Sequence, residues 1–495
     1  MEKLQKKYGL FTGIAMVVGI VIGSGVFLKA GKVLNLSGGN LLVSLSAWLI
    51  GGLIMITSGF CFAVFANRVK KYNGVVDYVE LSSNKKVGYG LAWLITTLYY
   101  PTIASIVSVF ASAYFVDLIG LSDVILGDSI GSIYQLLGSW QVYLIGFGFV
   151  TLFSALNYFA PKIAGKFQVS ATVIKLIPIF VIAIVGLFAS LFVEGGGVAN
   201  AFSQNANVEG VVMNFGEAVK TTAFAYEGWV CATIINAELK DSKKNLPRAL
   251  VGGTIVIVLF YILYYIGVSA SVSFTSNGTY YVGNNAAILS DANAPLFIFD
   301  NILGIVGKKI FTIFILVSCL GTVNGVTMAC GRGMYTMACR GLGPVPEKMS
   351  VLNEKTNMPF LSCLIGYLCS VLLLVLWYLA NTGVGVFKYL GNMDTTVCAL
   401  IYGTYIIMFV YMIRNFKELN VFQRFVMPIV AIIGCTFFIL VGTGLFQLIV
   451  NKTTDSLIEF GVWMVLFVIM MAPCLFFYRK DAVSIIEDDE AEEAK

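Results

Sequence analysis

Residues 11–31 read FTGIAMVVGIVIGSGVFLKAG, an apolar stretch that Gly23-Ser24-Gly25 interrupts near its centre. About 20 apolar residues form a helix that spans a bilayer, and each glycine inside a helix costs about 1 kcal/mol relative to alanine. If the helix unwinds at this triplet, its second half begins at mid-membrane, where unpaired backbone N–H groups form an anion site. Irregular backbone at this depth is tolerated where it lines a cavity. The stretch therefore predicts a membrane span that is broken around a binding site.

A second stretch, residues 221–238, reads TTAFAYEGWVCATIINAE and carries Glu227-Gly228 near its middle. A carboxylate at that depth costs about 2.5–3.5 kcal/mol on insertion scales, so it should face the interior of a helix bundle or water. If the helix breaks here, its first half ends in the free carbonyls of Phe224 and Ala225, which suit an ammonium group. The two breaks are complementary, because one offers N–H groups to a carboxylate and the other offers carbonyls to an amine. Together they predict a site for an α-amino acid.

The composition of the whole chain agrees with a membrane protein. Of the 495 residues, 58% are hydrophobic and 12% are charged, whereas soluble domains carry about 25% charge. This excludes a soluble enzyme, a nucleic-acid-binding protein and a disordered protein. The chain has no histidine, which excludes His-based catalytic triads and His-ligated metals. Its 10 cysteines form no CxxC motif, and we expect neither a metal nor a cofactor.

The apolar stretches predict an all-α membrane protein with twelve spans. The expected spans lie at 11–36, 40–66, 90–119, 139–160, 167–193, 213–237, 248–273, 303–335, 359–380, 385–413, 423–449 and 457–478. We divide the chain into a first five-helix half at 1–193, a second, inverted half at 194–413, two further spans at 414–480 and an acidic tail at 481–495. The two broken spans, the first and the sixth, hold matching positions in the two halves. Paired interrupted spans of this kind are typical of inverted-repeat transporters.

The distribution of basic residues predicts the orientation in the membrane. The loops 120–138, 194–212 and 274–302 contain no lysine or arginine. The basic residues lie instead in the loops on the other side, and cytoplasmic loops are the ones enriched in Lys and Arg. We therefore expect a multi-pass protein of the cell membrane with both termini in the cytoplasm.

Four polar residues inside the spans are further candidates. Lys175 lies in VSATVIKLIPIF (169–180). It either extends to the membrane surface or holds its ammonium against the helix-end carbonyls of the first span, where it would replace a bound cation. Glu227 is open to three interpretations: it recognises a basic or polar substrate side chain, binds a coupling proton, or pairs structurally with a neighbour. Asn324, which precedes a glycine in the eighth span, and Asp394 in the tenth are weaker candidates. Asn324 would face the cavity, and the alternative for Asp394 is that it only caps a helix or pairs locally.

Four segments of the chain resemble the amino acid–polyamine–organocation superfamily, in particular its L-type amino acid transporter branch and the bacterial relatives of that branch. These segments are IGSGVF at 22–27, VIKLIP at 173–178, FAYEGW at 224–229 and AELKDSKKNLPRAL at 237–250. The resemblance implies a LeuT-like fold of five-plus-five inverted repeats with two extra helices. It also implies sodium-independent transport, often as obligatory exchange.

The resemblance also assigns roles to individual residues. It implies that Gly23, Ser24 and Gly25 bind the substrate carboxylate and that Ala225 and Glu227 line the pocket. With the residues beside the two breaks and Asn324 added, the expected substrate-binding residues are Ile22, Gly23, Ser24, Gly25, Val26, Phe224, Ala225, Tyr226, Glu227 and Asn324. Phe224 would in addition close over the substrate as an outer gate, and Lys175 would stand in for sodium. Animal members of the branch pair with a heavy subunit through a cysteine after the third span. Residues 117–139 contain no cysteine, so we expect no disulfide-linked partner.

We therefore expect a sodium-independent L-amino acid transporter, working by alternating access as an exchanger of small neutral amino acids. Its partners would be the amino acid and the lipid bilayer. The alternatives are a proton-coupled symporter that uses Lys175 or Glu227 and a transporter of cationic amino acids whose side chains meet Glu227. A less favoured alternative is a membrane amino acid sensor, suggested by the acidic run at 487–493. An enzyme is not expected, since no nucleophile–base pair is visible.

Overall fold

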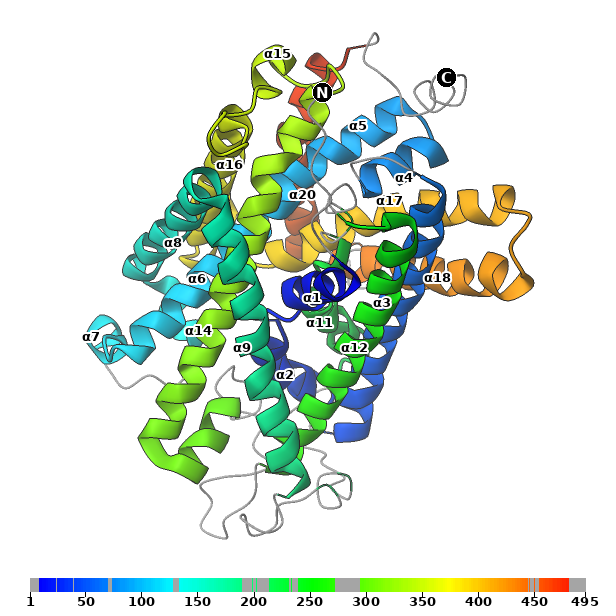
Figure 1. The fold of residues 1–495 in the computed structure, drawn as a ribbon. Coiled ribbons are helices and arrows are strands. Elements are labelled where there is room, and N and C mark those ends of the chain that lie inside the picture. The colour runs from blue at the N-terminus through cyan, green and yellow to red at the C-terminus, as the bar shows by residue number, and fades with distance from the viewer. Residues whose placement is uncertain are drawn as a thin grey trace.

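Helices make up every secondary-structure element in the part of the chain that the structure describes (Figure 1). The structure is a computed structural model. It describes residues 9–23, 25–38, 40–69, 74–127, 133–188, 198, 202, 213–230, 233, 239–271, 294–443, 445, 449 and 454–479. Ser24, most of the second half of the sixth span and the acidic tail therefore lie outside the described residues.

Ten helices in the described ranges are long and apolar enough to cross a membrane. They are α3 (Leu41–Arg68), the continuous α5 (Lys85–Leu94), η1 (Ile95–Tyr99) and α6 (Tyr100–Leu118), α8 (Trp140–Phe159), α9 (Pro161–Leu187), α12 (Ser242–Ser271), α14 (Ala294–Ala338), α16 (Phe360–Asn381), α17 (Met393–Asn415), the continuous η6 (Phe422–Val426) and α18 (Met427–Gly442), and α20 (Thr454–Phe476). The expected all-helical, multi-pass architecture is confirmed. The count of twelve spans and the inverted repeat stay predictions.

The two predicted spans outside this set of ten are the first and the sixth, in which the sequence predicts breaks. The first consists of α1 (Leu10–Val21) and α2 (Gly25–Leu36), two helices of 12 residues each. In the sixth, α11 (Phe215–Ala225) ends at a turn over residues 226–228. Each of these helices is shorter than the about 20 residues that a membrane crossing needs.

Several helices begin elsewhere than the apolar pattern predicts. The third span begins at Lys85 rather than at 90, because the side chain of Asn84 caps the helix by accepting from the N–H groups of residues 86 and 87. The fifth begins at Pro161 rather than at 167, since proline suits the first turn of a helix. The tenth begins at Met393 rather than at 385, because Gly385–Leu390 forms a separate 3₁₀ helix, η5. The hydropathy pattern alone does not reveal these helix starts.

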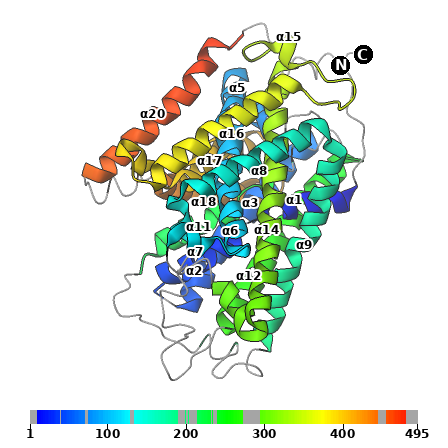
Figure 2. The same cartoon turned by 90° about the vertical axis from the view of Figure 1, so that its left-hand side faces the viewer.

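The short helices of the two broken spans lie in the middle of the bundle, as Figure 1 shows for α1, α2 and α11. Helix α1 packs against α9, α12 and α14, and α11 packs against α2, α3 and α17. In contrast, α20 runs along the outside (Figure 2). The long helices therefore surround the two breaks and cover them.

Candidate functional site

The break in the first span begins where α1 ends. Ile22 has a non-helical ψ of 84°, and the N–H of Gly23 bonds to the carbonyl of Val21 at 2.7 Å instead of continuing the helix. Helix α14 packs closely against this break. A Cβ atom added to Gly23 would lie 2.6 Å from the hydroxyl oxygen of Thr322 in α14. The glycine is required here because no side chain fits between the two segments.

Lys175 lies at the C-terminal end of α1. Its Nζ donates to the carbonyl of Gly19 at 2.5 Å, and the side chain is fully buried. In a continuous helix that carbonyl would accept from the N–H of Gly23, which here bonds to Val21. The ammonium of Lys175 therefore meets a carbonyl that the break sets free, and it does not extend to the membrane surface.

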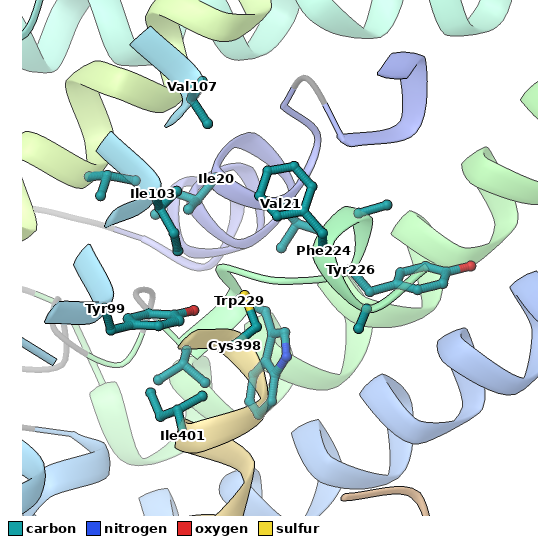
Figure 3. Packing of buried hydrophobic residues seen from close by; sticks show 14 of the residues in the cluster. Ile20, Val21, Tyr99, Ile103, Val107, Phe224, Tyr226, Trp229, Cys398 and Ile401 are labelled. Atoms are coloured by element: carbon teal, nitrogen blue, oxygen red, sulfur yellow. The ribbon is translucent and has the colours of Figure 1, made fainter. Parts of the chain in front are cut away.

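The break in the sixth span touches the break in the first. A Cβ on Gly25, the first residue of α2, would lie 2.6 Å from the Cα of Ala225, the last residue of α11. On the other side of the turn, Gly228 has a φ of +104°, and a Cβ there would lie 3.0 Å from Ile20. Figure 3 shows Phe224 beside Val21 at this crossing. The end of each half-helix thus lies against the backbone of the other span.

Tyr261 of α12 links the two breaks, although no feature of the sequence indicates this role. Its hydroxyl lies 3.1 Å from the carbonyl oxygen of Val21 and 2.8 Å from that of Ala225. These carbonyls are the helix ends of α1 and α11. Its ring packs against Tyr226, whose own hydroxyl donates to the carbonyl of Trp48 at 3.0 Å. Tyrosine is common in the apolar run of α12, so no sequence signal separated Tyr261 from its neighbours.

Glu227 lies beyond the break, facing the third and tenth predicted spans. Tyr99 donates a hydrogen bond to its Oε1, and Tyr402 of α17 lies beside the carboxyl group. Its Oε2 has no hydrogen-bond partner among the described residues, although Glu227 is only 5% exposed. Tyr99 ends η1, a π-helical turn, and such turns are frequent at functional sites. Figure 3 shows Tyr99, Cys398 and Trp229 around this region.

An ion pair lies next to Phe224. The Nζ of Lys29 in α2 lies 3.0 Å from Oδ2 of Asp394 in α17 and 5.1 Å from the centre of the Phe224 ring. All three residues are less than 9% exposed. Asp394 bonds locally, because its Oδ1 accepts from the N–H of Thr395, and it also pairs with Lys29, 365 positions away in the chain, which the sequence did not indicate.

Asn324 lies in a different environment from the other candidates. Its Nδ2 donates to Oε1 of Gln168 at 2.9 Å and to the carbonyl of Ala164 at 3.1 Å, both in α9. Its Oδ1 accepts from Asn157 of α8 at 3.3 Å. The amide therefore connects α14 to α8 and α9, and the structure does not bring it to the breaks.

Of the remaining candidates, Ile22 and Val26 are fully buried beside the first break, and Ser24 lies outside the described residues. The structure thus brings together Gly23, Gly25, Phe224, Ala225 and Glu227. It also places the N-terminus of α2 beside the C-terminal ends of α1 and α11 at one point inside the bundle. In general, a helix N-terminus attracts an anion and a helix C-terminus attracts a cation.

The model of the amino acid permease family matches residues 8–472. The chain belongs to this family. The permease is 30% identical over 72% of its length to the serine/threonine exchanger SteT of Bacillus subtilis, of which the match covers 74%. It is 21% identical over 72% of its length to the human cystine/glutamate transporter and 24% identical over 75% to the human large neutral amino acids transporter small subunit 2. The matches cover 65% and 64% of those two proteins, slightly less than two thirds.

These relatives carry the names of transporters and exchangers. The permease is therefore a transporter rather than an enzyme, and its substrate is an amino acid. The resemblance to the amino acid–polyamine–organocation superfamily seen in the sequence is confirmed by the family match and by these relatives.

Proposed function

We propose that this permease is a sodium-independent exchanger of small neutral L-amino acids that works by alternating access in the cell membrane. The observation that carries the proposal is the contact between Lys175 and Gly19. A fixed ammonium on the freed carbonyl of α1 supplies the positive charge that a bound sodium ion would bring to a broken helix. The charge is part of the protein, so no ion has to bind.

The backbone at the two breaks would bind the charged ends of the substrate. The N-terminus of α2, from Gly25 onward, would accept the carboxylate, because the first N–H groups of a helix have no intrahelical partner. The C-terminus of α11, with the carbonyls of Phe224 and Ala225, would accept the amine. The two helix ends lie side by side at Gly25 and Ala225, so a single small substrate would reach both.

The substrate side chain would meet Glu227. The Oε2 of this residue, which has no hydrogen-bond partner in the part of the chain that the structure describes, is a hydrogen-bond acceptor, and the nearby phenols of Tyr99 and Tyr402 are donors. This polar wall favours a short side chain that carries a hydroxyl group. The exchange of serine and threonine named for SteT supports this choice. A cationic substrate is the alternative, since its positive charge would pair with the glutamate.

Phe224 would close the site towards one side of the membrane, held by the neighbouring Lys29–Asp394 pair. The distribution of basic residues supports the assignment of that side as extracellular and of both termini as cytoplasmic. The residues around both breaks are nearly fully buried, as they would be in a state closed to both sides of the membrane.

The test is uptake of a panel of labelled amino acids into proteoliposomes that are empty or preloaded with the same amino acid, in sodium-free buffer. The proposal expects uptake only into preloaded vesicles, strongest for serine, threonine or alanine. Uptake that requires sodium, or that is equal in empty vesicles, would contradict it. Arginine or lysine as the best substrate would establish the cationic alternative.

The second candidate function is proton-coupled symport, favoured by the Oε2 of Glu227, for which the described residues supply no hydrogen-bond partner. A carboxyl group in this position is able to carry a proton across the membrane. A symporter would take up substrate into empty vesicles when the exterior is acidic, and Glu227→Gln would abolish that response. An exchanger would show no such dependence on the pH gradient.

A further inference from the structure

The hairpin that joins α17 to α18 carries more positive charge than its own residues neutralise. Residues 414–426 read RNFKELNVFQRFV and contain one acidic side chain, that of Glu418. This carboxylate binds Arg68 at the end of α3, whose Nε lies 3.2 Å from its Oε1. No described residue forms an ion pair with the three basic side chains of the hairpin, which are Arg414, Lys417 and Arg424. Their positive charges are therefore available to a partner outside the chain.

Arg424 is held in place by the backbone of the neighbouring helix. Its Nε donates to the carbonyl of Ile413 at 2.8 Å, and its guanidinium lies 4.9 Å from the centre of the Phe425 ring. Because Ile413 directly precedes Arg414, this bond brings the backbone of one arginine next to the side chain of the other. Arg424 belongs to η6, a π-helical turn, and such turns are frequent at functional sites. The hairpin thus holds one guanidinium in a fixed position beside a second basic residue.

An exposed apolar stripe leads away from these charges along the outer face of α18. Its members lie four residues apart, on one side of the helix, and each is at least 37% exposed: Val421, Phe425, Ile429 and Ile433. The stripe is twelve residues long, or about 18 Å in a helix. One leaflet of the hydrocarbon core is about 15 Å thick. The stripe therefore matches the length of an acyl chain in one leaflet.

The basic end of the stripe lies at a membrane surface. Helix α17 and the continuous η6 and α18 are both long and apolar enough to cross a membrane, so the hairpin lies where both leave the bilayer. Figure 1 shows this hairpin, in orange, at the edge of the bundle. Anionic lipid headgroups are attracted to basic residues next to a membrane span, with about 1 kcal/mol for each lysine or arginine. Charge and position thus favour a lipid as the partner.

We propose that the hairpin of α17 and α18 binds an anionic phospholipid. The lipid phosphate lies among Arg414, Lys417 and the Nη groups of Arg424, and one acyl chain follows the stripe from Val421 to Ile433. The basic end and the apolar stripe match the two parts of one lipid molecule, whereas a free phosphate would use only the basic end. This inference requires neither exchange nor a particular amino acid substrate, so it stands independently of the proposed function.

The first test measures lipid binding by native mass spectrometry of the full-length permease, titrated in detergent with phosphatidylglycerol or phosphatidylcholine. The double variant Arg414→Gln with Lys417→Gln removes two charges and leaves the bond between Arg424 and Ile413 in place. Its apparent affinity for phosphatidylglycerol should fall at least about fivefold, the factor that one basic residue near the membrane surface contributes. Its affinity for phosphatidylcholine should not change, because that headgroup has no net charge.

The matched control is the double variant Lys162→Gln with Lys166→Gln, which removes two exposed lysines at the start of α9 and the same net charge. It should bind phosphatidylglycerol as the parent does. Equal losses in the two double variants would show that net charge rather than the hairpin attracts the lipid. Unchanged affinity in the hairpin variant would overturn the proposal and leave a soluble acidic protein as the partner of this surface. If the double variant does not fold, judged by its thermal midpoint, the exposed Lys417→Gln alone takes its place.

The second test separates a lipid from a free phosphate. Ile429→Ser interrupts the stripe without touching the basic end and should weaken phosphatidylglycerol binding at least about twofold, since it removes apolar contact area. Ile469→Ser is the control, because Ile469 is an exposed apolar residue of α20, outside the stripe. A tenfold excess of inorganic phosphate should not displace the lipid. If phosphate displaces it, or if the two isoleucine variants bind alike, the hairpin recognises a phosphate group alone and the lipid assignment is wrong.

The third test measures stability in nanodiscs of phosphatidylcholine with and without phosphatidylglycerol. A ligand that binds the folded state raises its stability, so the thermal midpoint of the parent should rise with the fraction of phosphatidylglycerol. The rise should be absent in the hairpin variant and preserved in the α9 control. An equal rise in both would place the stabilising lipid elsewhere on the permease and contradict the proposal.

Discussion

Lys29 of α2 and Asp394 of α17 join two distant parts of the permease next to Phe224. Their Nζ and Oδ2 atoms lie 3.0 Å apart, and the same ammonium lies over the Phe224 ring at 5.1 Å. Both charges are 8% exposed. A charge so deeply buried depends on its partner, so the position of α2 depends on that of α17.

The first prediction concerns the loss of this pair. Asp394→Asn leaves the Lys29 ammonium without its counter-charge, and breaking a buried pair in this way lowers the free energy of unfolding by about 3–5 kcal/mol. The thermal midpoint in detergent measures the effect. The control is the double variant Lys29→Met with Asp394→Leu, which removes both charges and should cost less than the single change. A double variant less stable than Asp394→Asn would show that packing rather than charge joins the helices.

The second prediction concerns Lys175. Lys175→Ala removes the donor to the Gly19 carbonyl, and an unpaired buried acceptor costs about 1–3 kcal/mol. We expect sodium-free exchange in proteoliposomes to fall at least about tenfold, and Lys175→Arg not to restore it, because a guanidinium is planar and larger than an ammonium. Lys162→Ala, which changes an exposed lysine of the same helix, should leave exchange intact. Full exchange by Lys175→Ala would remove the main support for the proposed sodium independence.

The breaks were accessible from the sequence, and the place of Lys175 was narrowed to two alternatives, because each feature violates a rule of the bilayer. A Gly-Ser-Gly triplet and a glutamate inside apolar runs are costly in a continuous span. The structure ends α1 at Val21 and α11 at Ala225, both next to those residues. Lys175 is costly for the same reason, and the freed carbonyl of Gly19 is the nearest place where the cost is offset.

The Lys29–Asp394 pair and Asn324 could not be placed from the sequence. Both depend on which helices become neighbours, and hydropathy does not encode helix packing. Asn324 lies in an apolar span, so its amide needs hydrogen-bond partners. A substrate or a neighbouring helix would satisfy it equally, and in the structure Gln168 of α9 does so. In the sequence, Lys29 looks like a lysine near the membrane surface. Its ion pair with Asp394 becomes visible only when α17 is placed beside α2.

The third prediction concerns the crossing of the two breaks. A Cβ on Gly25 would lie 2.6 Å from the Cα of Ala225, which is backbone and cannot rotate away. Gly25→Ala should therefore separate the helix ends and abolish exchange, with a loss of about 1–3 kcal/mol in the free energy of unfolding, as overpacking produces. Gly252→Ala in α12 is the control, because nothing lies within 4 Å of its Cβ. Equal activity of the two variants would contradict the close approach of the breaks.

The fourth prediction concerns the tyrosine that links the breaks. Tyr261→Phe keeps the ring but removes the hydroxyl that lies 3.1 Å from the carbonyl of Val21 and 2.8 Å from that of Ala225. Loss of this link should lower the thermal stability by about 0.5–1.5 kcal/mol, the net worth of one hydrogen bond. It should also weaken substrate binding, because the two helix ends lose the group that sets their spacing.

Tyr264→Phe supplies the matched control for that prediction. Tyr264 lies one helical turn further along α12, is equally buried, and its hydroxyl has no hydrogen-bond partner among the described residues. Its removal should therefore leave both stability and substrate affinity unchanged or slightly improved. Affinity measured by isothermal titration, together with the thermal midpoint, separates the two variants. If Tyr261→Phe and Tyr264→Phe behave alike, the hydroxyl of Tyr261 does not position the helix ends, and the ring packing against Tyr226 and Trp48 is what holds the two breaks together.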